Sequence, residues 1–331
     1  MAPCGATPGG CADIDPSIYP SIHPSIAPQK RPDIRLPDIQ ARLLRELASV
    51  NPRIVLVLLH GGMVGLDDVL DHVPAVVSAG YPGRYASTVL PEALLGIRDR
   101  GCWGKTTVTW YRNSFGDDFN MLDFDMSRPP GRTYRYHTGE PNFRFGHGLN
   151  PLTTFALSGL AVRPGGNCTT TTDEDAPPPG EGGGAGGRPA AGTTVAAVVV
   201  TRSCPEVVLS VTVENTGPRA ADEVVLAYFR PLDIPRTEPA AKLREQLFGF
   251  ERIHLRPLSP RAVVTFAVRA DRSLELATGS GTPKTFPGRY ALVVSNGSDR
   301  LETTVVVGGD GRFRVEEDHP TTTTEPGERV S

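Results

Sequence analysis

The stretch Ile54-Val55-Leu56-Val57-Leu58-Leu59 is an unbroken apolar run with the length of a β-strand. A strand that is apolar on both of its faces is best buried inside a parallel sheet. His60-Gly61-Gly62 follows the run and predicts a turn at the carboxyl end of the strand. Open α/β sheets place ligands at that end, but a lone histidine there more often has a structural role. The run therefore predicts a buried parallel strand that leads into a glycine turn.

The segments on both sides of this run alternate between helix and strand. Before the run, apolar residues recur at helical spacing from Leu36 to Val50. Asn51-Pro52 ends that helix, because the residue before a proline avoids the α region. After the run we expect a helix over residues 64–72, a strand over 74–78 and a helix over 85–95. This order predicts an α/β fold, as a partial α/β sandwich with a mostly parallel sheet, over residues 36–162.

The composition changes after residue 162. Residues 163–193 contain runs of threonine, proline and glycine, so they are expected to form a linker without a core of its own. From residue 194 the apolar period is two, which is typical of strands. The expected strands cover residues 207–213, 223–229, 262–268, 290–295 and 302–307. Short strands separated by turns predict an all-β sandwich of immunoglobulin or fibronectin III-like architecture over residues 194–310.

Both ends of the chain are expected to be disordered. Residues 1–35 carry a Pro-Ser-Ile repeat at Pro16, Pro20 and Pro24, and proline at every fourth position forbids a continuous helix. This segment has low complexity, and a proline-rich docking peptide is the alternative interpretation. Residues 311–331 are polar and are expected to fray.

Length, charge and motif content exclude several classes of protein. The 331 residues are consistent with about two domains. The formal net charge of −3 comes without a basic stripe, so nucleic acid is not an expected partner. No apolar run approaches the roughly 18 residues of a membrane span, so no membrane contact is expected. Walker and dinucleotide fingerprints are absent from the sequence, and we expect no cofactor.

The cysteines and the glycosylation triplets bear on the compartment. The five cysteines form no CxxC pair and show no Cys/His spacing typical of zinc, so no metal site is expected. Cys168 and Cys204 flank the linker; free thiols are the favoured interpretation, and a disulfide is the alternative. The triplets at Asn167 and Asn296 are candidate N-glycosylation sites, which permit a secreted protein but also arise by chance. The N-terminus lacks the pattern of a signal peptide.

Several short motifs, all in one order, carry a family resemblance. Residues 130–139 read PGRTYRYHTG, and residues 145–155 read FGHGLNPLTTF. Both resemble the C-terminal signature of family 3 glycoside hydrolases, closest to the β-xylosidase branch. Further similar segments are LPDIQ at 36–40, GYPG at 80–83, GKTTVTWY at 104–111, MLDFDMSR at 121–128, VENTG at 213–217, QLFGF at 246–250 and PGRY at 287–290. The resemblance is collinear over residues 31–308, with the linker as an insertion.

The resemblance implies an extracellular retaining glycosidase, a β-xylosidase or α-L-arabinofuranosidase, that acts on xylo-oligosaccharides in xylan catabolism. Such enzymes need two carboxyl groups about 5 Å apart, a nucleophile and a general acid/base. In the family the nucleophile is an Asp on an N-terminal barrel, and the acid/base is a Glu upstream of the helix that begins near Leu36. No residue of this chain matches either position, so the resemblance assigns no catalytic residue and implies that the isolated chain is inactive. The alternative is a non-catalytic carbohydrate-binding or accessory module.

Other side chains admit a plain and a sharper interpretation. Asp67, Asp68 and Asp71 lie near an expected helix start, where carboxylates cap a helix and complement its dipole, with a catalytic role as the alternative. The acidic residues before the signature are interpreted as turn residues, with a metal site as the alternative: Asp117, Asp118, Asp123 and Asp125. The aromatic residues of the signature are expected to fill the seam between the two domains, with stacking on a sugar as the alternative: Tyr134, Tyr136, Phe143 and Phe145. The α/β region has no Gly-x-Ser-x-Gly elbow, so a serine hydrolase is not expected.

Overall fold

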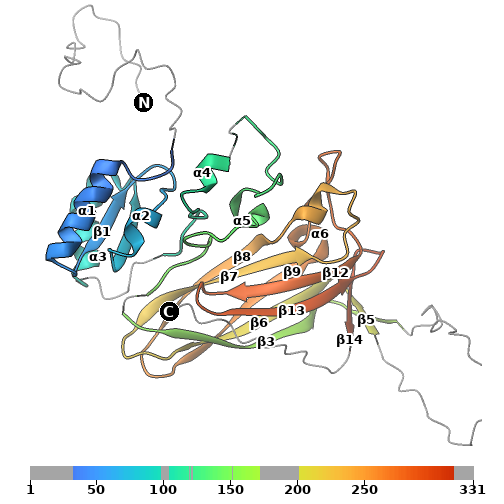
Figure 1. Ribbon diagram of the computed structural model, residues 1–331. Coiled ribbons are helices and arrows are strands. Elements are labelled where there is room, and N and C mark those ends of the chain that lie inside the picture. Colours follow the sequence, from blue (N-terminus) through green and yellow to red (C-terminus); the bar gives the residue numbers. More distant parts are fainter. Residues whose placement is uncertain are drawn as a thin grey trace, which may run out of the picture.

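The computed structural model describes residues 33–97, 104–118, 120, 122–150, 152–171 and 201–316. Nearly all of the expected low-complexity N-terminus, most of the expected linker and residues 317–331 lie outside this part of the chain. The described residues form a small α/β unit and a larger β-sandwich (Figure 1). An irregular segment with α4 (Phe115–Asp118) and α5 (Thr133–Tyr136) lies between them.

The α/β unit follows the order expected from the sequence. Its elements are α1 (Asp38–Val50), β1 (Val55–Leu59), α2 (Asp67–Leu70), β2 (Ala75–Gly80), η2 (Gly83–Tyr85) and α3 (Ala86–Leu94). β1 and β2 pair in parallel, with Leu56 opposite Val76. Gly96 follows α3 with a φ of +68°, a left-handed conformation that glycine adopts without steric cost.

The parallel sheet is smaller than the sequence predicted. Within the described residues it contains β1 and β2 alone, and the other strand pairs are antiparallel. A mostly parallel sheet is therefore not confirmed. The expected burial of β1 on both faces is also wrong, because Val55 is 51% and Leu59 is 64% exposed, whereas Leu58 is buried. With only two strands in the sheet, much of the apolar run has no neighbouring layer to pack against.

Helix α1 is apolar on two faces, and only one of them is packed. Ala41 and Leu44 contact the core of the α/β unit, together with Leu58, Val69 and Trp110. The second face is a stripe at helical spacing that stays exposed: Ile39, Leu43, Leu47 and Val50. Apolar surface of this kind on a helix is typical of a face that packs against a further element.

The β-sandwich consists of two antiparallel sheets (Figure 1). In the described part of the chain, one sheet has the strand order β4-β5-β14-β13-β12-β7-β8 and the other has the order β3-β6-β9. The strands are β3 (Phe155–Gly165), β4 (Thr169–Thr171), β5 (Thr201–Cys204), β6 (Glu206–Asn215), β7 (Ala221–Pro231), β8 (Gln246–Leu255), β9 (Arg261–Arg269), β12 (Gly288–Ser295), β13 (Arg300–Val307) and β14 (Phe313–Glu316). Shorter elements between them are η3 (Pro239–Lys242), α6 (Ala270–Ser273), β10 (Leu276–Ala277) and β11 (Pro283–Lys284).

The strands expected from apolar alternation are confirmed as β6, β7, β9, β12 and β13. The sandwich nevertheless begins and ends outside the limits that the sequence predicted. β3 pairs with β6 although it precedes the Thr/Pro/Gly-rich segment, and β14 pairs with β13 and β5 inside the expected C-terminal tail. β8 has no alternating pattern, because this edge strand leaves most of its residues half-buried or exposed.

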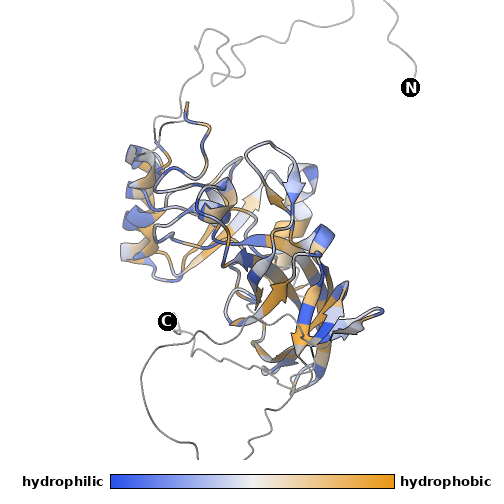
Figure 2. Ribbon diagram, turned by 90° about the vertical axis from the view of Figure 1, so that its right-hand side faces the viewer, coloured by the Kyte–Doolittle hydropathy of each residue, from blue (hydrophilic) through white to orange (hydrophobic). Residues whose placement is uncertain are grey.

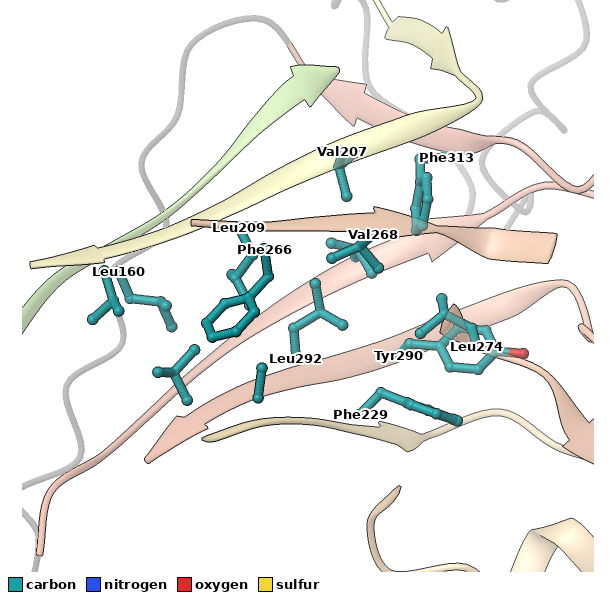
Figure 3. Packing of buried hydrophobic residues seen from close by; sticks show 14 of the residues in the cluster. Leu160, Val207, Leu209, Phe229, Phe266, Val268, Leu274, Tyr290, Leu292 and Phe313 are labelled. Atoms are coloured by element: carbon teal, nitrogen blue, oxygen red, sulfur yellow. The ribbon is translucent and has the colours of Figure 1, made fainter. Parts of the chain in front are cut away.

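Alternate side chains from both sheets fill the space between them (Figure 3). Along the strands of the sandwich, hydrophobic and hydrophilic residues alternate in the colouring of the ribbon (Figure 2). On β6, every second residue from Val207 to Val213 is buried. Phe229, Leu292 and Phe313 of the larger sheet are fully buried and lie in the same cluster (Figure 3). This alternation is the period-two pattern on which the prediction of a sandwich rested.

Tyr290, the last residue of the PGRY segment, anchors the backbone of Phe286 just before that segment. The ring is fully buried, and its hydroxyl donates to the carbonyl of Phe286 (2.6 Å) and accepts the N–H of the same residue (3.1 Å). Burial raises the pKa of this hydroxyl to about 12, so it remains a donor at neutral pH. Tyr290→Phe leaves two buried backbone groups unpaired and is expected to cost about 1–3 kcal/mol in urea unfolding. Tyr85→Phe, at an exposed ring, is the control, and an equal loss in both variants would contradict the prediction.

Cys168 and Cys204 are joined by a disulfide, which corrects the expectation of free thiols. β4 and β5 pair antiparallel with Thr169 opposite Ser203, and this pairing brings the cysteines together across a sequence separation of 36 residues. In the sequence both strands border the linker and carry no apolar alternation, so the pairing depends on the fold. In the described residues no helix has the length and apolar character that crossing a membrane requires.

Candidate functional site

The signature segment folds into a tight turn held by its own backbone. The Pro129–Pro130 peptide bond is cis, and Gly131 and Thr133 have φ angles of +79° and +59°. A β-carbon on Gly131 would collide with the carbonyl oxygen of Tyr136, so this position requires glycine. The N–H of Thr138 donates to the carbonyl of Pro130 (2.8 Å) and closes the turn around α5.

His137 contacts both this turn and the segment with Tyr111 and Phe115. Its Nδ1 donates to the carbonyl oxygen of Gly131 at 3.2 Å. The imidazole meets the rings of Tyr111 and Phe115 edge-on, and these two rings stack with centroids 3.8 Å apart. The hydroxyl of Tyr111 accepts the N–H of Thr133 (2.5 Å). Burial lowers the pKa of His137 below its ordinary value of 6.5, so the imidazole is held in the neutral form that this packing requires.

Tyr134 and Phe145 pack on the sandwich, as expected for a seam between two domains. Their rings stack at 4.3 Å, and both contact Tyr228 of β7, with centroids 6.0 and 6.4 Å away. The hydroxyl of Tyr134 accepts the N–H of Leu247 on β8 (3.2 Å). Burial raises the pKa of the Tyr228 hydroxyl far above its usual range. Tyr136 packs against the main core of the sandwich.

Phe143 connects the same segment to the core of the α/β unit. Its carbonyl accepts the N–H of Trp110 (2.9 Å), and the two rings meet edge-on. Trp110 is 3% exposed and also contacts His60 at the end of β1. On its other side Phe143 stacks on His147, with ring centroids 5.1 Å apart. The aromatic residues of the signature thus pack against both parts of the chain.

A buried ion pair joins the start of this segment to β7. Nζ of Lys105 lies 2.8 Å from Oε1 of Glu223, and the two side chains are only 10% and 6% exposed. Lys105 also donates to the carbonyl of Gly148 (2.7 Å), and Glu223 accepts the N–H of Val224 (2.7 Å). Each charge therefore has a partner and a further hydrogen bond, which is what burial of an ion pair requires.

Asp67 and Asp68 join neighbouring loops, and neither they nor Asp71 cap a helix. Asp67 accepts the backbone N–H of Asn113 (3.1 Å) and the amide of Asn142 (2.6 Å), and Asp68 accepts the side-chain amide of Asn113 (2.9 Å). α2 has no side-chain cap, and Asp71 lies at its C-terminal end. The capping prediction is wrong, because this helix is a single turn and its acidic side chains reach toward the neighbouring segment.

The second group of carboxylates makes local contacts. These are Asp117 with Arg35, Asp123 with Arg128, and Asp125 with Ser127. Asp118 is the last residue of α4. Within the described ranges, no three His, Cys, Asp or Glu side chains gather in a way that could hold a metal ion.

The turn, the aromatic residues Tyr134 and Phe145 of the seam, and Lys105 of the ion pair belong to a segment with known counterparts. Residues 24–150 match the sequence profile of the glycosyl hydrolase family 3 C-terminal domain. Over these residues the chain is similar to a family 3 C-terminal domain. This finding confirms the resemblance read from the motifs, and it covers the α/β unit together with the signature segment.

Curated proteins similar to this chain include xylosidases from fungi and plants. The exo-1,4-β-xylosidase of Aspergillus oryzae is 28% identical over 275 residues, which cover 81% of this chain and 32% of the relative. The β-xylosidase/α-L-arabinofuranosidase 1 of Medicago sativa is 25% identical over 276 residues, which cover 80% of this chain and 33% of the relative. The chain thus spans about a third of the length of these relatives.

Solved structures of β-glucosidases share the fold. The enzyme from Bifidobacterium adolescentis aligns with a TM-score of 0.62 at 21% identity, over 90% of this chain and 38% of that protein. The β-D-glucoside glucohydrolase of Trichoderma reesei aligns with a TM-score of 0.58 at 25% identity, over 81% of this chain and 35% of that protein.

The half-buried histidine His147, near the ion pair, makes the chain sensitive to acid. Burial, and after it the Lys105 cation, lower the pKa of His147 below 6.5. Well above pH 6.5 the histidine is neutral in both the folded and the unfolded chain, so the free energy of unfolding does not depend on its protonation. As the pH falls below 6.5 the unfolded chain binds the proton first, and the free energy of unfolding decreases. Between pH 7 and pH 5 we expect the melting temperature to fall less for His147→Gln than for the unmodified chain; an equal fall would contradict this.

The two candidate glycosylation asparagines differ in exposure. Asn167 is exposed and directly precedes the disulfide-bonded Cys168. Asn296 is 1% exposed, and its side-chain oxygen accepts the N–H groups of Ser298 (3.1 Å) and Asp299 (2.7 Å). The second asparagine is therefore part of a buried turn between β12 and β13.

Proposed function

We propose that this chain forms the C-terminal part of a β-xylosidase-like glycosidase that hydrolyses xylo-oligosaccharides with retention. The observation that carries the proposal is the similarity to exo-1,4-β-xylosidases over 81% of the chain. In this proposal the nucleophile and the general acid/base lie on other parts of the enzyme, and the residues described above form its scaffold. The domain limits proposed are a family 3 α/β part up to about residue 150 and a fibronectin III-like sandwich from β3 to β14.

Exposed apolar surface supports this proposal. The stripe on α1 and the exposed residues of β1 belong to an α/β unit whose sheet has two strands among the described residues. Further parallel strands and their helices, supplied by the rest of the enzyme, would cover both surfaces and complete the mostly parallel sheet.

An activity assay tests the proposal in two parts. The chain of 331 residues is expected to release no nitrophenol from p-nitrophenyl β-xyloside above the buffer rate, because both carboxylates are supplied elsewhere. The protein translated from the complete native transcript is expected to cleave the same substrate. Hydrolysis by the short chain, or an inactive product of the complete transcript, would contradict the proposal.

A non-catalytic carbohydrate-binding module is the second candidate. Exposed tyrosines of the α/β unit favour it, because Tyr81 is 83% and Tyr85 is 60% exposed, and exposed rings are able to stack on sugars. Sedimentation with insoluble xylan separates the candidates. Retention of the chain above an unrelated control protein supports the module, and retention equal to the control counts against it.

We propose an extracellular location for the intact enzyme. The disulfide between Cys168 and Cys204 supports this, since such bonds persist in oxidising compartments. Of the two acceptor triplets, we propose Asn167 as the glycosylated one in the folded protein, because Asn296 is buried.

A further inference from the structure

A serine and a histidine meet at the carboxyl ends of the two parallel strands. Ser78 lies on β2 opposite Leu58 of β1, and it is exposed. His60 directly follows β1 and is half-buried. Oγ of Ser78 lies 2.8 Å from Nε2 of His60, within the distance at which a nucleophile and its base share a hydrogen bond.

The second ring nitrogen sets the direction of this hydrogen bond. Nδ1 of His60 lies 2.6 Å from the carbonyl oxygen of Gly62, which can only accept. In the neutral imidazole Nδ1 therefore carries the hydrogen, and Nε2 accepts from the hydroxyl of Ser78. In this tautomer a histidine can act as a general base toward serine. The carbonyl of Gly62 orients the imidazole, as a carboxylate does in serine hydrolases with a Ser-His-Asp triad.

The pair is supported from the core and open toward solvent. Trp110 is 3% exposed and contacts the imidazole of His60 edge-on, with ring centroids 5.1 Å apart. The phenol of Tyr81 lies over Gly61 of the same turn, where a β-carbon would come within 2.5 Å of the hydroxyl oxygen. The ring of Tyr81 is 83% exposed, so the turn presents a second hydroxyl to solvent beside the pair.

We propose that Ser78 and His60 form a nucleophile–base pair that hydrolyses small O-acyl esters. This activity does not rest on the proposed glycosidase function. Oγ of Ser78 bonds to the acyl carbon while its proton passes to Nε2 of His60, and the ester bond breaks as the alcohol leaves with that proton. Water then gives a proton to Nε2, its oxygen bonds to the acyl carbon, and Ser78 leaves with the proton. The sum consumes one water and yields one alcohol and one carboxylic acid.

The open position of the pair favours one class of ester. A small acyl group needs contact only with the serine and the turn, whereas the alcohol remains in solvent. We therefore expect acetyl esters of large alcohols to be accepted as readily as acetyl esters of small ones.

Covalent labelling tests the proposal on the full chain. Incubation with a fluorophosphonate, followed by peptide mass spectrometry, is expected to place one phosphonyl group on Ser78. Ser78→Ala is expected to lose the label, and His60→Gln to label at least about 100-fold more slowly, the usual contribution of a general base. Ser49→Ala is the matched control, because Ser49 is another exposed serine, hydrogen-bonded to a backbone carbonyl, and this variant is expected to label as the unmodified chain does. Hydrolysis of p-nitrophenyl acetate should follow the same order.

The first criterion is the residue of the unmodified chain that carries the phosphonyl group. An unmodified chain that takes up no label, or takes it up on another serine, overturns the proposal. Equal labelling of His60→Gln and the unmodified chain also overturns it, since the base would then have no role. Matching far-UV circular dichroism of the variants shows that a lost label reflects chemistry and not unfolding.

Discussion

Glu223→Gln is expected to lower the free energy of unfolding by about 3–5 kcal/mol, because it leaves the ammonium of Lys105 buried without its counter-charge. The side chains of this pair are 10% and 6% exposed, so water cannot replace the lost carboxylate. The pair links the loop at residue 105 to β7, and its loss weakens the contact between the α/β unit and the sandwich. Urea unfolding followed by circular dichroism measures the change.

Two further variants show whether the buried charge is the cause. Glu302→Gln removes a carboxylate from an ion pair with Arg230 in which both side chains are 39% exposed, and it is expected to cost less than about 1 kcal/mol. The double variant Lys105→Met/Glu223→Leu removes both charges and is expected to be more stable than Glu223→Gln. The explanation fails if Glu223→Gln and Glu302→Gln destabilise the chain equally.

Phe229→Ala is expected to cost about 3–5 kcal/mol, the range for deleting a buried aromatic ring. Phe229 is fully buried between the two sheets, near Tyr290 (Figure 3). The ring centroids of Phe248 and Tyr290 lie 6.5 and 6.2 Å from that of Phe229. These neighbours belong to other strands of the same sheet, so a cavity at this point loosens three strands at once. Differential scanning calorimetry should show a lower melting temperature for the sandwich.

Phe250→Ala is the matched control for this prediction. Phe250 is 67% exposed on the neighbouring strand β8, opposite Leu226 of β7. Its removal opens no cavity, and the expected change is within about 0.5 kcal/mol. If the two phenylalanine variants melt at the same temperature, the buried ring of Phe229 does not stabilise the sandwich as proposed.

The local pattern of apolar residues was sufficient to predict most of the helices and strands. Apolar spacing predicted α1, β1 and β2 as well as the alternating strands β6, β7, β9, β12 and β13, because each of these carries its own burial pattern. β3 and β8 were not predicted, since both are edge strands without such a pattern. β14 was not predicted either, because its four residues are too few to show an alternation. The disulfide between Cys168 and Cys204 was not predicted either, because it depends on the pairing of β4 with β5.

The sequence by itself indicated the resemblance to family 3 and the order of the two parts, because short motifs and the apolar period are local properties. The need for glycine at position 131 became visible only in the structure, where a β-carbon would collide with the carbonyl oxygen of Tyr136. Only the tertiary structure decided which side chains meet. Lys105 reaches Glu223, and His60 reaches Ser78, across sequence distances that no spacing rule covers. Ion pairs and hydrogen bonds need atoms within about 3 Å of each other, and the packing of distant segments alone brings them that close.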